Sequence, residues 1–436
     1  MNAGQHTLPV LAPPRNGCLS ALDDRNRAGE DAFVPLRIHI PPLRFLRKPS
    51  PPTPDKIPPS GSAWSRVDEA WKFPIALFVV TRFALVACSY MGLVLTLRTF
   101  DGSMKCLPEL RAHPAMQSFC CWDCGWFHRA AIEGFPTVES AQVFPLLPIL
   151  AWLLKTLFFI PRQYGLVIVA NLASLASYSV LFRLFRRLEG TSAARWGLTA
   201  LAAYPFHFFQ AVGYSESLMV LTSALAVLLA LDGRHLRAGL ALGFGVLARH
   251  ITLFAGAGLL IAQIRQRGIH PKRLLLSRDV AGLVIPFLFL GAWVVYLHSR
   301  FHSWTVIHDA RMASWWGQMG RAYWGVVDVL KLMPYDRHPE YVFYLFFALI
   351  PLAGTIALFF RQRWFELAFS AAILLFVCFS SGGASLGRYT GSCWPAFLPV
   401  GIWLGRRPYL APILLGGLML FQGLFFFLHG HGFQIV

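Results

Sequence analysis

Charged side chains are scarce in this sequence. Asp, Glu, Lys and Arg make up 14% of its 436 residues, whereas a soluble domain carries about 25%. Hydrophobic residues make up 56%, and the mean hydropathy is +0.52. The shortage of charge argues against two or three soluble domains. We therefore expect a membrane protein that crosses the bilayer several times.

Acidic residues are the scarcer kind of charge, with 21 Asp and Glu against 39 Lys and Arg and a formal net charge of +18. Such a surplus commonly indicates a nucleic-acid partner. Here the basic residues cluster in short loops between apolar runs, a pattern that marks the cytoplasmic side of a membrane protein. The sequence therefore predicts no nucleic-acid partner. The clusters are Arg183, Arg186, Arg187 and Arg195; Arg265, Arg267, Lys272, Arg273 and Arg278; Arg361 and Arg363; and Arg406 and Arg407.

Residues 1–72 lack an apolar run of the length found in signal peptides. The first hydrophobic segment, 73–96, is therefore expected to be an uncleaved anchor. The leader is rich in proline pairs and mixes both signs of charge, so it buries too little surface to offset its ordering entropy. The sequence predicts a disordered cytoplasmic tail over 1–72 and a transmembrane domain over 73–430. The alternative for the tail is a proline-rich docking site for a protein partner.

The remaining apolar segments predict an all-α polytopic fold with about nine to eleven spans. Segment 143–160 contains Pro145, Pro148 and Lys155, and we expect it to lie on the membrane surface or to be re-entrant. Segment 236–264 is flanked by basic loops at both ends, so it must turn back on itself near Arg249 and His250. The other expected spans are 73–96, 164–182, 196–213, 216–232, 279–297, 341–360, 365–380, 392–405 and 409–428.

Arg82 interrupts the first span about halfway along. A charge at that depth is unfavourable unless it faces the bundle interior or an anionic group. We consider two partners for it: the phosphate of a lipid, or a carboxylate in an intramembrane ion pair.

Two long loops fall on the non-cytoplasmic side by the positive-inside rule, 97–142 and 298–340. We expect the first to carry juxtamembrane helices and the catalytic residues. The second is rich in tryptophan, which is typical of a helix at the membrane interface; the alternative is a lid over an external site. Its tryptophans are Trp304, Trp315, Trp316 and Trp324.

The first loop contains four cysteines, Cys106, Cys120, Cys121 and Cys124. Cys121-x-x-Cys124 has the spacing of a redox motif or of half a zinc site, which His113 and His128 would complete. No second CxxC is present, and no strand–helix context surrounds this one. An external loop permits disulfides, so we expect disulfides or free thiols, with one bridge between Cys106 and the other three.

Polar and aromatic side chains gather at the external ends of the spans. A carboxylate, arginines and aromatic rings at one face of an apolar bundle suit a substrate with a lipid tail, an anionic phosphate and a hydroxyl that must lose its proton. The residues are Asp123 and its neighbours Trp122, Trp126, Phe127 and Arg129; Tyr214 and Glu216; Arg249; and Arg388 and Tyr389.

Several of these residues lie in a resemblance to a known family. The stretch WDCGWFHRAAIEGF at 122–135 resembles the WDxxW(Y/F)xxIAxxGY signature of the glycosylphosphatidylinositol mannosyltransferase II (PIG-V-like) family and its bacterial homologues. Similar elements follow in the family's order: FPLLP at 144–148, AYPFHFF and YSESL within 203–218, AG to LAR within 238–249, and RY at 388–389 before Pro395. The chain departs from the pattern at Cys124, at Ala131 and at 250–252, where Pro-Thr-Gly is usual.

The resemblance implies a GT-C glycosyltransferase fold with its active site on the non-cytoplasmic face. It implies a polyprenyl-phosphate mannose or similar donor, a lipid or glycan acceptor, and Asp123 as the general base of an inverting single displacement. The leaving phosphate needs cationic stabilisation, for which Arg388, Arg249 and Arg129 are the candidates in that order. We expect no cofactor; a metal ion is the alternative, although the external loops contain no DxD pair to favour one. The membrane is expected to be the bacterial cytoplasmic membrane, or that of the endoplasmic reticulum in a eukaryote.

Two other functions fit parts of the sequence. Arg82 and the segments broken by glycine and proline would suit a transporter or lipid flippase. The sequence has no evident internal repeat, however, and its polar residues concentrate in one external loop. A non-catalytic subunit of a glycosylation complex is the other alternative, with the proline-rich tail as its docking element.

Overall fold

The computed structural model describes residues 63–95, 106–110, 113–268, 279–313, 340–380, 385–433 and 435. These residues form helices and turns, with one isolated bridge between Cys106 and Cys121 in place of any sheet. The predicted all-α class is therefore confirmed. Three expectations lie outside the described residues: the tail over 1–62, the basic residues of 269–278, and the part of the second external loop over 314–339 that holds Trp315, Trp316 and Trp324.

Five helices are long and apolar enough to cross a membrane: α1 (Ala63–Leu95), α5 (Arg162–Ala203), α10 (Val280–Phe301), α14 (Glu340–Phe360) and α18 (Leu410–Gly430). Large apolar side chains on them are exposed, including Phe83 at 75% and Leu420 at 73%. Side chains of this kind are stable at a surface that lipid covers, whereas water disfavours so large an apolar patch. The chain is a multi-pass membrane protein.

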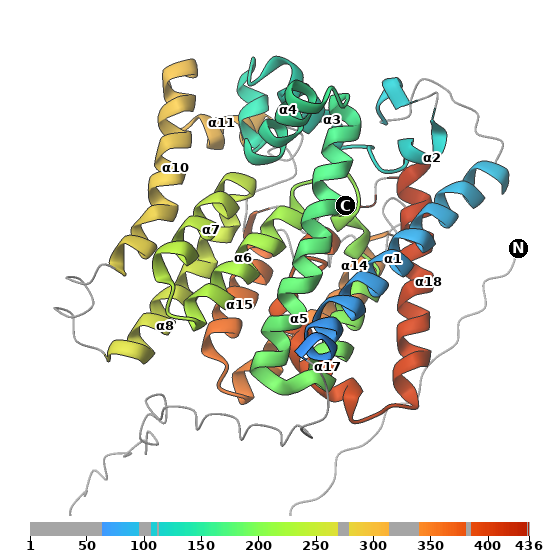
Figure 1. Cartoon of the computed structure of the whole chain (residues 1–436). Helices are drawn as coiled ribbons and strands as arrows, with labels where there is room; N and C mark the ends of the chain where they lie inside the picture. The colour runs from blue at the N-terminus through green and yellow to red at the C-terminus, as the bar shows by residue number, and fades with distance from the viewer. Residues whose placement is uncertain are drawn as a thin grey trace, which may run out of the picture. The chain divides into compact units, whose positions relative to one another are not determined.

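Shorter apolar helices fill the space between these five (Figure 1). They are α6 (Glu216–Leu231), α7 (His235–Ala248), α8 (Gly256–Arg267), α15 (Trp364–Ser380) and α17 (Phe397–Gly405). Glycines let some of them touch through their backbones. A Cβ atom at Gly239 of α7 would lie 2.3 Å from the carbonyl oxygen of Gly282 in α10, and one at Gly401 of α17 would lie 2.4 Å from the amide nitrogen of Gly197 in α5. Close approach of this kind is typical of packing between membrane helices.

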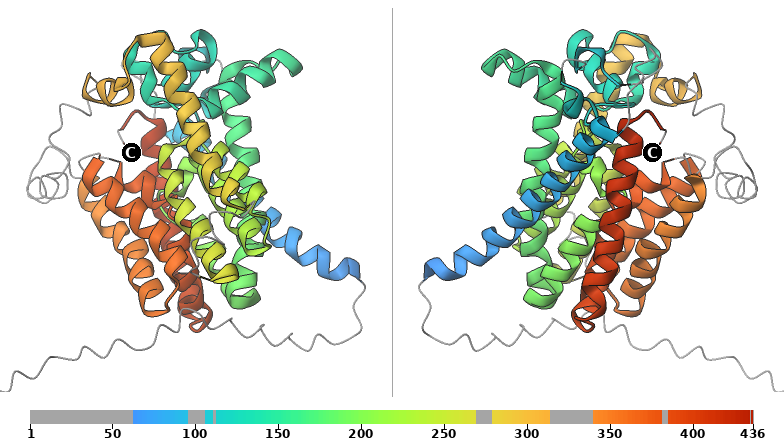
Figure 2. Two further views of the ribbon diagram at one scale, coloured as in Figure 1. Left: turned by 90° about the vertical axis from the view of Figure 1, so that its left-hand side faces the viewer. Right: turned by 90° about the vertical axis from the view of Figure 1, so that its right-hand side faces the viewer.

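Neither of the two segments that were expected to depart from an ordinary span, 143–160 and 236–264, is a single long helix. Helix α7 ends at Ala248, a 3₁₀ turn spans His250–Ala255, and α8 then begins, so segment 236–264 turns back as predicted. Helix α5 is two helices joined at Gly190, whose φ of 85° breaks the helical path beside a basic cluster. Helix α4 (Leu146–Phe158) has only 13 residues, too short to span. It lies beside α3 (Cys124–Glu133) at one end of the bundle (Figure 2).

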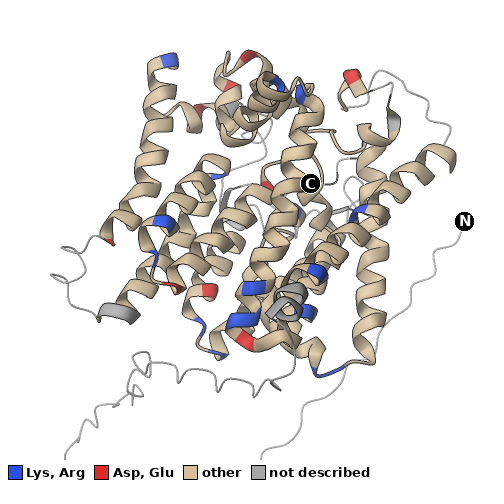
Figure 3. Cartoon of the chain, viewed as in Figure 1, with Lys and Arg blue, Asp and Glu red and all other residues tan. Residues whose placement is uncertain are grey.

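The basic clusters that the structure describes, at 183–195, 361–363 and 406–407, lie at the opposite end (Figure 3). Arg187 of α5 pairs with Asp232 at the end of α6, and Arg363, before α15, pairs with Glu189 next to the α5 kink. These ion pairs link the kink in α5 to the α6–α7 connection and to the α14–α15 connection, which are distant in sequence. The positive-inside rule predicts that this end faces the cytoplasm.

The hydrogen-bond partners of Arg82 among the described residues are neutral, so the expected intramembrane ion pair is not formed there. Its Nε donates to Asn171 Oδ1 at 2.7 Å and its Nη2 to Ser174 Oγ at 2.5 Å. Its guanidinium lies 4.5 Å from the centre of the Phe78 ring, and no carboxylate among the described residues pairs with it. Neutral acceptors and an aromatic face stabilise the cation without the desolvation of a second charge.

Candidate active site

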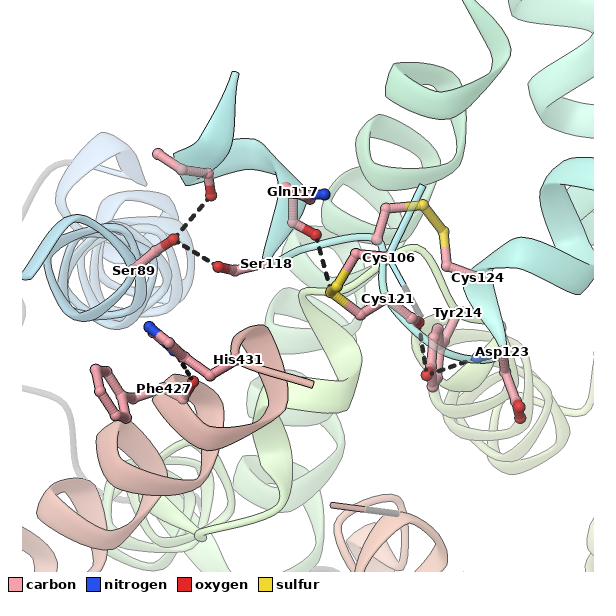
Figure 4. Close-up of a disulfide and its surroundings, with 12 residues drawn as sticks. Ser89, Cys106, Gln117, Ser118, Cys121, Asp123, Cys124, Tyr214, Phe427 and His431 are labelled. Atoms are coloured by element: carbon pink, nitrogen blue, oxygen red, sulfur yellow. Dashed lines mark hydrogen bonds between the residues drawn. A yellow bond between two sulfur atoms is a disulfide. The ribbon is translucent and has the colours of Figure 1, made fainter. Parts of the chain in front are cut away.

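The candidate site begins at Asp123, which immediately precedes α3. Its backbone N–H donates to the hydroxyl of Tyr214 at 3.1 Å, and that hydroxyl donates to the carbonyl of Cys121 at 3.0 Å (Figure 4). Trp122, between them, has a φ of 56°, in the left-handed region. The Asp123 side chain is 31% exposed. The turn thus presents a carboxylate that remains accessible while its backbone is held from behind.

The four cysteines of this loop form two disulfides, Cys106–Cys121 and Cys120–Cys124. The expected bridge between Cys106 and one of the other three cysteines is confirmed. Cys121 and Cys124 belong to different bridges. The CxxC pair is therefore neither a redox disulfide nor half of a zinc site in this structure. Among the described residues, no three His, Cys, Asp or Glu side chains are grouped to hold a metal ion.

Arg388, in α16 (Leu386–Thr390), connects the two carboxylates of the site. Its Nε donates to Glu216 Oε1 and its Nη1 to Asp123 Oδ2. Arg249 donates from Nη2 to the same Glu216 oxygen at 2.7 Å, and from Nε to Ser215 Oγ at 3.1 Å. Two anions and two cations therefore alternate from Asp123 to Arg249, and their charges cancel within a largely buried cluster.

Aromatic rings cover both guanidiniums. Arg388 lies 4.6 Å from the centre of the Tyr214 ring, and Arg249 lies 5.1 Å from that of Tyr389. Burial lowers the pKa of Arg388, but the carboxylates of Glu216 and Asp123 more than offset this, so its pKa is raised overall. Burial, with the nearby Asp123 charge, raises the pKa of Tyr214 well above its usual value. Tyr214 therefore stays a neutral hydrogen-bonding phenol and Arg388 stays charged.

A cavity of about 150 Å³ lies against this cluster. Its wall combines the Asp123 carboxylate and both guanidiniums with aromatic rings, so it is suited to a polar ligand with a ring to stack on them. The lining residues are Asp123, Trp126, Phe127, Gln142, Val143, Phe144, Ser215, Ala248, Arg249, His250, Ile307, Ser385, Arg388 and Tyr389.

A second and larger cavity, of about 880 Å³, adjoins the first. The two have neighbouring wall residues: Phe144 lines the first and Pro145 the second, while Ala248 lines the first and Leu247 the second. The larger cavity is apolar, and it lies between the end of α3, helix α4 and helix α10. Its lining residues are Ala130, Ala131, Ile132, Glu133, Gly134, Phe135, Pro145, Pro148, Ile149, Trp152, Leu247, Leu288, Phe289, Ala292, Trp293 and Tyr296.

The structure brings most of the sequence-predicted residues to the smaller cavity: Asp123, Trp126, Phe127, Arg249, Arg388 and Tyr389 line it. Tyr214 and Glu216 are buried and contact the lining residues. Trp122 does not line the cavity, although it precedes Asp123 in the turn. Arg129 is on the exposed face of α3, where it pairs with Glu133 at 2.9 Å. Arg129 is not among the residues that line the smaller cavity.

Several lining residues were absent from the sequence-predicted set. His250 stacks on Phe144 with ring centres 5.1 Å apart and meets Phe376 at the same distance. Ile307, in α11 (Val306–Ala313), brings the start of the second external loop to the cavity wall. The FPLLP element and the Arg-His bend were visible in the sequence, but neither showed that Phe144 and His250 meet.

Comparison with known proteins gives only distant structural likenesses. No family model matches the chain, and no curated protein matches it either. The Archaeoglobus fulgidus oligosaccharyltransferase in complex with Zn and sulfate is 12% identical to this chain, with a TM-score of 0.45. The match covers 82% of this chain and 53% of the oligosaccharyltransferase chain. The archaeal oligosaccharyltransferase AglB from the same organism, with an inhibitory peptide and a dolichol-phosphate, is 11% identical with a TM-score of 0.40, covering 83% and 56%.

The chain thus spans about half the length of these solved structures. The resemblance to the mannosyltransferase II family rests on the sequence elements alone, since no family model matches.

Proposed function

We propose that this protein is a membrane glycosyltransferase of the GT-C kind. It transfers a sugar, which we take to be mannose, from a polyprenyl-phosphate donor to a lipid or glycan acceptor on the non-cytoplasmic face. The observation that supports this most is the smaller cavity, where an accessible carboxylate and two guanidiniums lie next to a large apolar cavity. A bacterial cytoplasmic membrane, or the endoplasmic reticulum of a eukaryote, is the proposed location.

In the proposed reaction the acceptor hydroxyl attacks the anomeric carbon and gives its proton to Asp123. The bond between that carbon and the phosphate oxygen breaks, and the anomeric centre inverts. The polyprenyl phosphate leaves as an anion, so one base is sufficient and no general acid is needed. Trp126 and Tyr389, both on the cavity wall, are proposed to contact the sugar face.

The two arginines are proposed to have different roles. Arg388 is engaged with both carboxylates and its side chain is 5% exposed, whereas the side chain of Arg249 is 12% exposed. We therefore propose that Arg388 orients Asp123 and that Arg249 contacts the phosphate, which reverses the order expected from the sequence. Arg129 pairs with Glu133 and does not line the smaller cavity, so it has no proposed role.

The larger cavity supports a lipid-linked donor. Its wall is mainly apolar, and it lies between α4 and the lipid-facing helix α10. An isoprenoid chain that moves there from the bilayer stays in apolar surroundings, so no hydrophobic cost opposes the move. Its phosphate would then be next to Arg249, because Leu247 and Ala248 line the two cavities in turn.

Sugar transfer by the purified protein tests this proposal. The protein is reconstituted in lipid nanodiscs with polyprenyl-phosphate mannose and a lipid extract as acceptor, and the products are read by mass spectrometry. We expect mannose on an acceptor and an equal amount of released polyprenyl phosphate. The same protein is also reconstituted in sealed vesicles. Movement of the donor from one leaflet of the vesicle membrane to the other, without sugar transfer, would show a flippase instead. Transfer only after a partner protein is added would show a non-catalytic subunit.

Replacing Arg249 by glutamine tests the phosphate contact. The variant loses a charged hydrogen-bond donor, so kcat/KM for the donor should fall by about 10- to 100-fold, as expected for 1.5–3 kcal/mol. Steady-state transfer kinetics measure this. Arg187→Gln, at the cytoplasmic end, is the matched control and should leave kcat/KM unchanged. Equal kinetics in both variants would exclude Arg249 as the phosphate ligand.

A further inference from the structure

Two disulfides meet at the turn that carries Asp123. Cys120 and Cys121 are adjacent but bond to different partners. The Cys120–Cys124 bridge closes a ring of five residues with Trp122 and Asp123 inside it. The Cys106–Cys121 bridge ties the same turn to the preceding segment, where Leu107 N–H also donates to the Cys120 carbonyl at 3.2 Å. Asp123 therefore lies within one covalent ring that a second bridge anchors.

The five-residue ring packs against the segment that holds Tyr214. A Cβ atom at Gly213 would lie 2.6 Å from Cys124 Sγ and 3.5 Å from Cys120 Sγ, so the sulfurs occupy the space beside this glycine. The Gly213 N–H donates to the Phe119 carbonyl at 2.8 Å. Tyr214 then accepts from the Asp123 amide and donates to the Cys121 carbonyl (Figure 4). The sulfurs and the phenol thus fix the same turn from one side.

The backbone of the turn has an unusual conformation. Asp123 makes no side-chain capping bond to α3, and Trp122 has a φ of 56°, a conformation that a bulky residue seldom adopts without support from its surroundings. With the ring opened, the backbone at Trp122 can return to the favoured region of φ. The Asp123 amide would then move away from the Tyr214 hydroxyl, and its carboxylate away from Arg388.

We propose that the Cys120–Cys124 disulfide is a positioning element for Asp123, so that the site is complete only in the oxidised chain. A reductant that reaches the loop would inactivate the protein reversibly, and an oxidising compartment would keep it active. The predicted loss of activity on reduction rests on the proposed glycosyltransferase function. The predicted movement of the turn does not depend on that function.

The redox step can be written with a phosphine as the reductant. The sulfur–sulfur bond breaks, the phosphine is oxidised to its oxide with the oxygen of one water molecule, and the two sulfurs become thiols. Each bridge takes up two electrons and two protons in this way. Oxidised glutathione reverses the step by thiol–disulfide exchange, and is itself reduced to two thiols.

The experiment uses the full chain in nanodiscs with the four cysteines outside the loop cluster replaced by alanine. Hydrogen exchange with mass spectrometry is recorded before and after treatment with the phosphine, and again after reoxidation. We expect the Asp123 amide to exchange at least about tenfold faster after reduction, while α18 keeps its protection. Unchanged exchange at 119–127 would overturn the proposal, whether or not the protein transfers sugar.

Transfer kinetics supply the second measurement. Displacement of a catalytic group by about 1 Å can lower the rate about 100-fold, so the double variant C120A/C124A should lose about that much kcat while KM for the donor stays within about twofold. The matched double variant C106A/C121A keeps the five-residue ring and should lose much less. Equal losses of kcat in the two variants, or an active C120A/C124A, would contradict the assignment.

Discussion

Asp123→Asn should abolish nearly all sugar transfer while leaving the fold intact. The amide has almost the same shape as the carboxylate but cannot accept the proton of the attacking hydroxyl. Loss of a general base lowers kcat by about 10²- to 10⁴-fold. Arg388 keeps its second carboxylate, Glu216, so the ion-pair cluster persists. Single-turnover transfer from polyprenyl-phosphate mannose, with the membrane level of the protein checked by blotting, measures the effect.

Glu109→Gln is the matched control for this variant. It makes the same carboxylate-to-amide change in the same external loop, at an exposed residue outside both cavities. We expect normal transfer from it. Near-normal transfer by Asp123→Asn at normal protein levels would exclude Asp123 as the base.

Arg388→Leu should be among the most destabilising single substitutions in the chain. Glu216 is 1% exposed and would keep only Arg249, while Asp123 would lose its partner. Removing one member of a buried ion pair costs up to about 3–5 kcal/mol when the other charge is left without compensation, and Arg249 compensates part of the Glu216 charge here. We expect a clearly lower melting temperature in detergent, measured by loss of soluble monomer on heating, and loss of transfer with it.

Arg129→Leu makes the same change of side chain at an exposed ion pair. Arg129 and Glu133 are 47% and 49% exposed, and such a pair contributes at most about 0.5 kcal/mol. Its melting temperature should therefore remain close to that of the unmodified protein. If both leucine variants melted at the same temperature, the Arg388 cluster would have no special part in stability.

Local patterns were sufficient for most of the fold. Apolar segments of membrane length predicted the long helices, because a helix must bury its backbone polar groups along its own length. Pro145 and Pro148 indicated that α4 would not be an ordinary span. The basic loops indicated the opposite end of the bundle. The length of α1 was not predicted, since its first turns, from Ala63, precede the apolar segment.

The partners of buried groups required the tertiary structure. The sequence marked Arg82 as exceptional but suggested charged partners, whereas the structure gives it Asn171 and Ser174. The sequence also placed Arg129 among the phosphate ligands, whereas the structure pairs it with Glu133 at an exposed position outside the smaller cavity. In each case the deciding factor is which face of a helix meets which neighbour, and several arrangements of helices satisfy the same hydrophobic pattern.

The sequence by itself determined that this is a polytopic helical membrane protein and which of its loops are basic, and it predicted that Asp123 belongs to an external loop. Length, hydropathy and charge are properties of contiguous segments, so they can be read along the chain. Only the tertiary structure decided that Asp123, Glu216, Arg249 and Arg388 form one charged cluster and that Cys120 bonds to Cys124. The physical reason is that helix packing, including glycine contacts such as Gly239 with Gly282, sets these distances between residues far apart in sequence.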